Sequence, residues 1–193
     1  MGAPVIIEPV KTEWTEAEYL ADVGLDPQVR YEYLRGKVYA MSTPSAAHAE
    51  ISSNFFAPLH QHLRGKPCRP YLGNMALKIN FLGNPAYYIP DVMVACDDKP
   101  AHTNHREEPL VLMEIMSPST ASIDQREKRV AYTALPSLWH YLIVNSLKKE
   151  VFHYSRSGQG WTEIILTVPE EGIRIPELDF SLTVGELYEQ SGL

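Results

Sequence analysis

Cysteine is scarce in this chain of 193 residues. Only Cys68 and Cys96 are present, and neither belongs to a C-x-x-C pair. Two cysteines make no disulfide framework. We therefore expect both to be free, reduced thiols. The clusters His60-Gln61-His62 and His102-Thr103-Asn104-His105 lack partner ligands at the spacing of a zinc site, and we interpret both as surface features.

Long apolar runs are absent as well. No stretch of 18 or more uncharged apolar residues occurs, which excludes an obvious transmembrane helix. The opening residues MGAPVIIEPVKTEW contain too short an apolar patch and too many charges for a secretory signal. We expect a cytoplasmic protein with no membrane partner.

Basic residues are outnumbered, with 17 Lys and Arg against 24 Asp and Glu and a net charge of -7. This balance argues against tight non-specific binding to nucleic acid, although a metal ion that recruits phosphate locally could offset it. The content of 45% hydrophobic and 21% charged residues is ordinary for a globular protein. We expect one domain over residues 1–193, with residues 1–29 as an N-terminal helical extension.

Hydrophobic periodicity and capping patterns predict a mixed α/β (α+β) fold. Helices are expected from Thr15, over Ala46–Leu63, over Asp124–Leu135 and from Thr183. Strands are expected on both sides of Arg35-Gly36, over Met75–Phe81, Tyr87–Cys96 and Pro109–Met116, over the hairpin Leu138–Asn145 with Glu150–Arg156, and over Trp161–Val168. Gly83-Asn84-Pro85 should form a turn, and Asp97–Pro109 an exposed loop.

Glu114 interrupts the apolar run PLVLMEIM of a strand that should otherwise be buried. A buried carboxylate costs several kcal/mol unless it is paired, protonated or bound to a cation. A second acid, Asp91, lies in the apolar stretch YYIPDVMVAC. If the two strands are neighbours, a suitable register brings both carboxylates to one face, where they need a proton or a metal between them. Carboxylate oxygens are the ligands that Mg²⁺ or Mn²⁺ prefers.

A cationic side chain is available on the next helix. Asp124, Lys128 and Tyr132 recur at intervals of four and share one stripe, from which Lys128 could reach back over the sheet. The alternative is that Asp124 and Lys128 form a solvated salt bridge.

Other side chains also allow structural explanations. Asp91 alone could be a turn residue, Glu114 part of a structural ion pair with an arginine, and His48 a satisfied core or capping histidine at the wall of the site. Ser117 has no G-x-S-x-G context, so a serine-hydrolase site is not indicated, and we place it at the wall of the site.

Several motifs follow one another along the chain: YEYLRGKVYAMSTPSAAH, Pro90-Asp91, LMEIMSPST, Asp124, Lys128, Tyr132 and WHYLIVN. In this order they resemble the Uma-two family of restriction-endonuclease-like proteins, within the PD-(D/E)xK nuclease superfamily. The resemblance implies a restriction-endonuclease-like core, a mixed central sheet flanked by helices, and Mg²⁺-dependent (or Mn²⁺-dependent) hydrolysis of phosphodiester bonds in DNA.

By the same resemblance, Asp91 and Glu114 are metal ligands together with the main-chain carbonyl of Ile115, and Glu32 and His48 lie near the site. The position two residues after Glu114, where the superfamily has its lysine, is Met116. The resemblance makes Lys128, on the following helix, the substitute.

Three functions follow from this reasoning. The first is a metal-dependent endonuclease in which Asp91, Glu114 and Lys128 are catalytic. The second is a catalytically silent interaction or nucleic-acid-end recognition module, which the acidic charge favours. The third is a metal-dependent phosphoester hydrolase with another substrate. A homodimer is expected, because a nuclease that cuts both strands benefits from two-fold symmetry.

Overall fold

A computed structural model describes residues 13–21, 26, 28–100, 103–116, 124–158 and 160–193. The helices are α1 (Glu16–Leu20), α2 (Ala46–His62), α3 (Asp124–Thr133), α4 (Val184–Leu187) and the 3₁₀ turn η1 (Pro176–Leu178). The strands are β1 (Tyr31–Leu34), β2 (Lys37–Ala40), β3 (Arg69–Leu72), β4 (Ala76–Phe81), β5 (Asn84–Tyr88), β6 (Val92–Ala95), β7 (His105–Arg106), β8 (Pro109–Met116), β9 (His140–Asn145), β10 (Val151–Ser157), β11 (Gly160–Leu166), β12 (Gly172–Ile175) and β13 (Phe180–Thr183).

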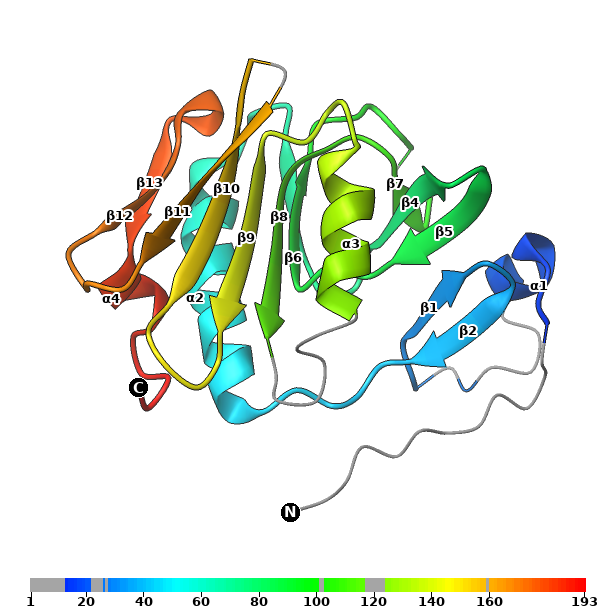
Figure 1. Cartoon of the computed structure of the whole chain (residues 1–193), viewed down its shortest axis with the longest axis horizontal. Coiled ribbons are helices and arrows are strands. Elements are labelled where there is room, and N and C mark those ends of the chain that lie inside the picture. The colour runs from blue at the N-terminus through cyan, green and yellow to red at the C-terminus, as the bar shows by residue number, and fades with distance from the viewer. Residues whose placement is uncertain (1–12, 22–25, 27, 101–102, 117–123, 159) are drawn as a thin grey trace.

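The centre of the fold is a mixed six-stranded sheet in the order β11-β10-β9-β8-β6-β3. Strands β8 and β9 are parallel, and α3 connects them, whereas the other neighbours are antiparallel. Burial on both faces explains why β8 and β9 are almost continuously apolar. Helix α2 lies behind this sheet and α3 in front of it (Figure 1). The predicted mixed sheet between helices is confirmed.

Helix α2 covers one face of the central sheet. Its residues Ile51, Phe55 and Leu59, spaced by four, are fully buried against the sheet, as the periodicity predicts. The β12-β13 hairpin and α4 complete this layer. These strands were not predicted, because Gly172–Thr183 is short and interrupted by Pro176, although the capping box at Thr183 that begins α4 is confirmed.

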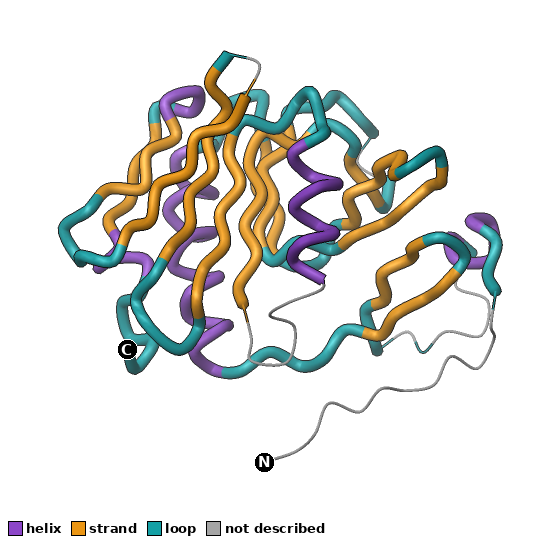
Figure 2. The backbone as a smooth tube through the Cα atoms, in the orientation of Figure 1, coloured by secondary structure: helices purple, strands orange, loops and turns teal. Residues whose placement is uncertain are grey.

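The opposite face of the central sheet carries α3 and a second sheet of five strands, in the order β2-β1-β5-β4-β7. Tyr132 of α3 and Tyr141 of β9 meet edge to face in this layer. The hairpins β1-β2 and β4-β5 follow the predicted antiparallel pairing. The turn between β4 and β5 lies at Leu82-Gly83, one position earlier than expected. Figure 2 shows how these hairpins extend from the central sheet beyond α3.

The predicted single strand Tyr87–Cys96 is wrong, because it is divided at Asp91 between the two sheets. Strand β5 belongs to the five-stranded sheet and β6 to the six-stranded one. Pro90 has no N–H to contribute to a ladder, and the N–H of Ile89 donates to the Glu32 carboxylate at 3.0 Å. The break places Asp91 where the two sheets meet.

The segment Asp97–Pro109 is also more ordered than an exposed loop. It contains β7, which pairs in parallel with the start of β4. Arg106 is only 4% exposed and forms an ion pair of 3.1 Å with Asp97. A buried guanidinium of this kind has no local sequence signal, since its partner is nine residues away.

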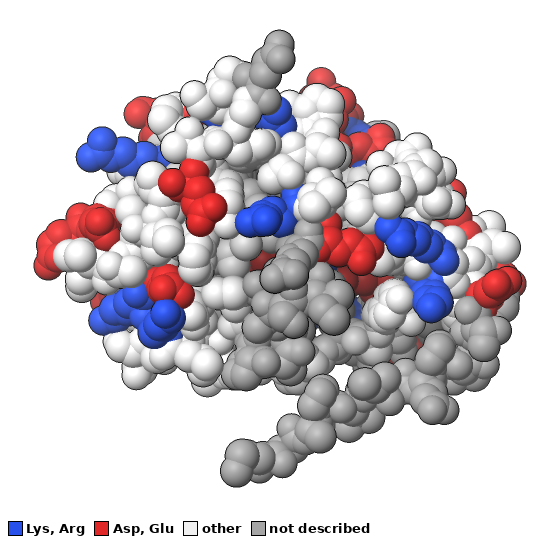
Figure 3. Space-filling model, viewed as in Figure 1, with Lys and Arg blue, Asp and Glu red and all other residues white. Residues whose placement is uncertain are grey.

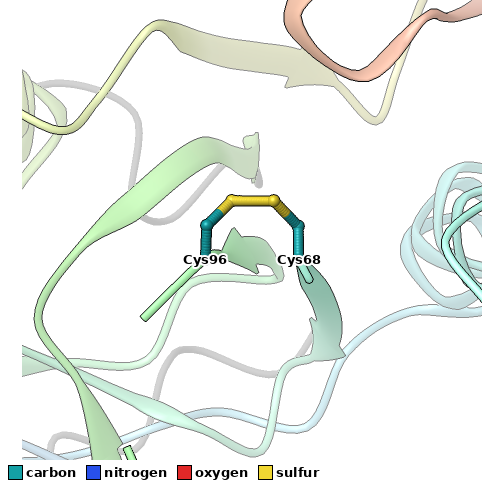
Figure 4. Close-up of a disulfide and its surroundings, with 2 residues drawn as sticks. All are labelled: Cys68 and Cys96. Carbon is teal, nitrogen blue, oxygen red and sulfur yellow. A yellow bond between two sulfur atoms is a disulfide. The ribbon is translucent and has the colours of Figure 1, made fainter. Parts of the chain in front are cut away.

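The two cysteines are not free thiols, which corrects the prediction made from their spacing. Cys68 and Cys96 form a disulfide bond (Figure 4). The antiparallel pair β3-β6 brings them together, because Arg69 lies opposite Ala95 and the two cysteines are the next residues outward. A separation of 28 residues gave no indication of this contact.

Among the residues that the structure describes, no helix is long and apolar enough to cross a membrane.

Candidate active site

The two anomalous acids and the helical lysine converge where the two sheets and two helices meet. Asp91 directly precedes β6, Glu114 lies near the end of β8, and Lys128 comes from α3. Glu32 of β1 and His48 of α2 reach the same place. Five separate elements therefore contribute to one polar cluster, which we call the carboxylate cluster: Glu32, His48, Asp91, Glu114 and Lys128.

Asp91 is held by hydrogen bonds at both carboxylate oxygens. In the ladder of β6 and β8, Val92 lies opposite Met113, so Asp91 comes one step further along, beside Glu114. Its Oδ2 accepts the N–H of Ile115 at 2.7 Å, and its Oδ1 lies 2.9 Å from Nε2 of His48. His48 is in the first turn of α2, whose N-terminal end favours a nearby negative charge.

Glu114 lies on the face of β8 that is turned toward α3, with 14% of its side chain exposed. Burial raises the pKa of the Glu114 carboxyl to about 8, against the opposing effect of Lys128. The negative charges of Asp91 and Glu32 add to this rise. The hydroxyl of Tyr132 donates to Oε1 of Glu114 at 2.9 Å. Burial keeps the pKa of Tyr132 well above its ordinary value, so this donor stays protonated.

Lys128 is buried, with an exposed fraction of 8%, and does not point to solvent. Its ammonium lies 2.9 Å from Oε1 of Glu32 and 3.4 Å from Oε1 of Glu114. It also lies 5.6 Å from the centre of the Tyr88 ring. The side chain of Lys128 is therefore not on the solvated surface, and that of Asp124, the partner considered from the sequence, lies outside the described residues. The ion-pair partner of Glu114 is Lys128 rather than an arginine.

Glu32 has a more central position than sequence reasoning gave it. It accepts both the N–H of Ile89 and the ammonium of Lys128 through the same oxygen, Oε1. Only the family resemblance pointed to this residue. In the sequence, Glu32 is one more polar residue in an alternating hairpin strand, which is the pattern of a solvent-facing side chain. Its pairing depends on contacts across 96 residues of chain.

Several predicted site residues lie at or beyond the limits of what the structure describes. Ser117 lies outside the described residues, and of Asp124 only its position at the start of α3 is described. Met116 is at the end of β8, where it is partly buried. A role for the Ile115 carbonyl in metal binding stays a prediction, since it is the N–H of Ile115 that contacts Asp91.

The charges of the cluster suit a divalent cation. Three acidic side chains gather near a single ammonium, and burial together with the charges of Asp91 and Glu32 raises the pKa of Glu114, so a cation bound there would favour its charged form. Within the described part of the chain, no group of three or more His, Cys, Asp and Glu side chains is arranged to hold a metal by itself. Mg²⁺ does not require such a group, because it commonly binds one or two carboxylates and keeps several waters. The donor set fits Mg²⁺ or Mn²⁺ in that mode.

Comparison with known proteins identifies the family of this chain. The family model Uma2, described as "Putative restriction endonuclease", matches residues 14–185. The chain belongs to the Uma2 family. Two relatives from Synechocystis sp. (strain ATCC 27184 / PCC 6803 / Kazusa) are described as uncharacterized proteins. The protein slr1290 is 31% identical over 160 residues, covering 82% of this chain and 83% of that protein. The protein sll1609 is 26% identical over 148 residues, covering 75% and 81%.

A solved structure has the same fold. It is a crystal structure from Anabaena variabilis ATCC 29413, described as "a putative nuclease belonging to DUF820". The two structures superpose with a TM-score of 0.69 over 91% of this chain and 97% of the other, at 17% sequence identity. This likeness shows the α+β fold of this Uma2 protein. The family match by itself places the chain in a family described as "Putative restriction endonuclease".

Proposed function

We propose that this Uma2 protein is a Mg²⁺-dependent endonuclease that hydrolyses phosphodiester bonds in DNA. The observation that carries the proposal is the position of Lys128. Its ammonium lies beside Glu114 although the lysine comes from α3 and not from β8. Two acids on neighbouring strands and one buried lysine are the groups that metal-dependent phosphodiester cleavage needs.

Asp91 and Glu114 would hold the divalent ion. When bound, such an ion supplies Lewis-acid activation of the phosphate and of the attacking water. Asp91 is oriented for this role by His48 and by the Ile115 N–H. Glu114 is oriented by the Tyr132 hydroxyl. These hydrogen bonds fix both carboxylates before substrate arrives, so little reorganisation is required during the reaction.

Lys128 would stabilise the negative charge that develops on the phosphate oxygens. Its ammonium lies 2.9 Å from Oε1 of Glu32 and 3.4 Å from Oε1 of Glu114, and these contacts fix its position in a poorly solvated site. A preorganised cation in such surroundings interacts more strongly with a developing anion than it would in water. Glu32 is thus a positioning residue for Lys128.

Cleavage of supercoiled plasmid and linear duplex DNA by purified protein, with Mg²⁺ or Mn²⁺, tests the proposal. We expect nicking or linearisation by the wild-type protein, and its loss in Glu114→Ala. Glu163→Ala, a matched substitution of an exposed glutamate on β11, should retain full activity. Cleavage that survives Glu114→Ala would come from a contaminating nuclease and would overturn the proposal.

Two other outcomes distinguish the alternatives. A folded protein that takes up no Mn²⁺ at millimolar concentration would support a silent interaction or DNA-end recognition module, which the net charge of -7 favours. Metal-dependent hydrolysis of a small phosphoester, without DNA cleavage, would support a phosphoester hydrolase with another substrate.

We further propose that the protein acts as a homodimer, because two symmetric sites allow both DNA strands to be cut. Light scattering coupled to size exclusion gives the molar mass directly. A mass of about twice the 21.8 kDa chain supports the dimer, and the mass of one chain contradicts it.

A further inference from the structure

We infer that Arg30 binds a backbone phosphate of the substrate next to the one that is cut. The inference rests on the proposed nuclease function and adds a residue that fixes where nucleic acid lies. It starts from Arg30, an exposed residue directly before β1 whose guanidinium contacts the chain next to Asp91.

The backbone sets the direction of the Arg30 side chain. The carbonyl of Arg30 accepts the N–H of Met41 at 2.8 Å, which extends the β1-β2 hairpin by one more bond. Side chains two residues apart in an extended chain lie on the same face. Arg30 therefore shares a face with Glu32, which contacts Lys128 inside the cluster.

Gly73, in the connection between β3 and β4, locates the guanidinium relative to Asp91. Nη1 of Arg30 donates to the Gly73 carbonyl. A Cβ on Gly73 would lie 2.8 Å from Nη1 of Arg30 and 3.7 Å from the main-chain oxygen of Asp91. The guanidinium and the main chain of Asp91 thus both lie close to one small residue. Gly73 has a φ of +51°, and its lack of a side chain permits this close approach.

The remaining hydrogen-bonding capacity of Arg30 suits phosphate. A guanidinium has five N–H donors, and the contact with Gly73 uses one of its nitrogens. Among the described residues, Arg30 forms no ion pair. By contrast, the cationic groups of Arg35 and Lys78 are paired with Glu127 and Glu16. An unpaired, planar cation beside a carboxylate site matches a phosphate oxygen pair.

The charge distribution makes one such residue important. On the face in Figure 3, Lys and Arg side chains stand in separate groups among acidic ones and form no continuous basic stripe across the described residues. A duplex approaching this face therefore meets few cations. A cation held next to the carboxylate cluster would reduce the repulsion between the cluster and the phosphate backbone.

The test compares Arg30→Ala, Arg30→Lys and the control Arg64→Ala. Arg64 is exposed beyond the C-terminal end of α2, about 25 Å along the helix from its N-terminal turn at His48. Steady-state cleavage of a duplex with Mn²⁺ gives KM and kcat. Binding of a fluorescein-labelled duplex, in the Glu114→Ala background with Mg²⁺, gives affinity as a function of salt.

We expect Arg30→Ala to raise KM and Kd about tenfold, with a much smaller effect on kcat, and to lower the salt slope of binding by about one. Arg30→Lys should recover part of the affinity and the full slope, because it keeps the charge and loses the planar fork. Arg64→Ala should have the same KM, kcat, Kd and salt slope as the parent protein.

Two results would overturn the inference. One is unchanged binding and KM in Arg30→Ala. The other is a loss of kcat with an unchanged salt slope, which would mean that Arg30 only supports the Gly73 connection. Failure of the proposed nuclease function would appear differently, as absence of cleavage by the wild-type protein while Arg30 still determined the affinity for DNA. Absence of DNA binding by the parent would refute both.

Discussion

The Lys128 ammonium on α3 lies 3.4 Å from the Glu114 carboxylate on β8, across 14 residues of chain. In the sequence, Met116 occupies the strand position that the resemblance assigns to a lysine. Burial of Lys128 against Glu114 and Glu32 means that the cation reaches the cluster by another route. For the chemistry of the site, the place of the ammonium in space matters more than the place of the lysine in the sequence.

This relationship predicts the effect of moving the lysine. Lys128→Met should lower the DNA cleavage rate by at least about 100-fold, because a preorganised cation contributes about 3 kcal/mol or more to the transition state. Adding Met116→Lys should restore part of the rate, since residue 116 lies on β8 two residues after Glu114 and on the same face. Single-turnover cleavage measures both. Equal rates in Lys128→Met and wild type would exclude a catalytic role for this lysine.

Tyr132→Phe should destabilise the fold. The change removes a hydrogen bond of 2.9 Å to Glu114 at a position with no exposed surface. We expect a loss of about 1–2 kcal/mol in the free energy of unfolding, as is usual for a buried hydrogen bond. Urea denaturation measures it. The matched variant Tyr39→Phe, at a side chain that is 49% exposed, should be neutral, and an equal effect in both would contradict the assignment.

A buried histidine pair predicts acid sensitivity. Nε2 of His153 lies 2.9 Å from Nδ1 of His140, whose Nε2 lies 2.6 Å from Glu177. Burial, reinforced by His140, lowers the pKa of His153 to about 4. An unfolded histidine has a pKa of about 6.5, so the unfolded chain binds a proton first. The stability contributed by neutral His153 is complete above pH of about 6.5 and is lost as the pH falls toward 4.

Urea denaturation at pH 7.5 and pH 5 tests this sign and magnitude. His153 should account for about 2 kcal/mol of the stability lost between these two values. In His153→Gln, the free energy of unfolding should fall by about 2 kcal/mol less between the two pH values than in the wild type. His60→Gln, at an exposed position on α2, should show the same pH dependence as the wild type. An identical pH dependence in His153→Gln and wild type would refute the explanation.

The disulfide bond predicts a dependence of stability on reductant. Because it closes a loop of 28 residues that includes Asp91, the bond should contribute about 3–4 kcal/mol to the free energy of unfolding. Thermal unfolding with and without a reducing agent measures this contribution. The double variant Cys68→Ala, Cys96→Ala should unfold like the reduced wild type under both conditions. Two titratable thiols in the oxidised, unfolded protein would show that the bond does not form.

Local features of this fold are predictable from the sequence because their physical causes lie within a few residues. The capping boxes of α1 and α4, the hairpin at Arg35-Gly36 and the apolar spacing of α2 are examples. The shared face of Lys128 and Tyr132 is another, since both side chains reach Glu114 from successive turns of α3.

The remaining features depend on contacts between distant segments. The disulfide, the division of residues 87–96 at Asp91, and the approach of Glu32 to Lys128 all arise from how strands pair. The pairing of His140 with His153 has the same origin, because it requires the β9-β10 register. Nothing in the local pattern distinguishes these side chains from ordinary strand residues. A buried charge indicates that a partner exists, but the fold alone decides which residue it is.

Calorimetric titration of Mn²⁺ into the oxidised protein measures metal binding by Asp91 and Glu114, on which every proposed catalytic step depends. We predict one site per chain in the wild type and at least about tenfold weaker binding in Asp91→Asn, since a ligand charge is lost. Asp98→Asn, at an exposed aspartate in the connection that follows β6, should bind Mn²⁺ like the wild type. A folded wild-type protein that takes up no Mn²⁺, or equal binding in Asp91→Asn, would contradict the account.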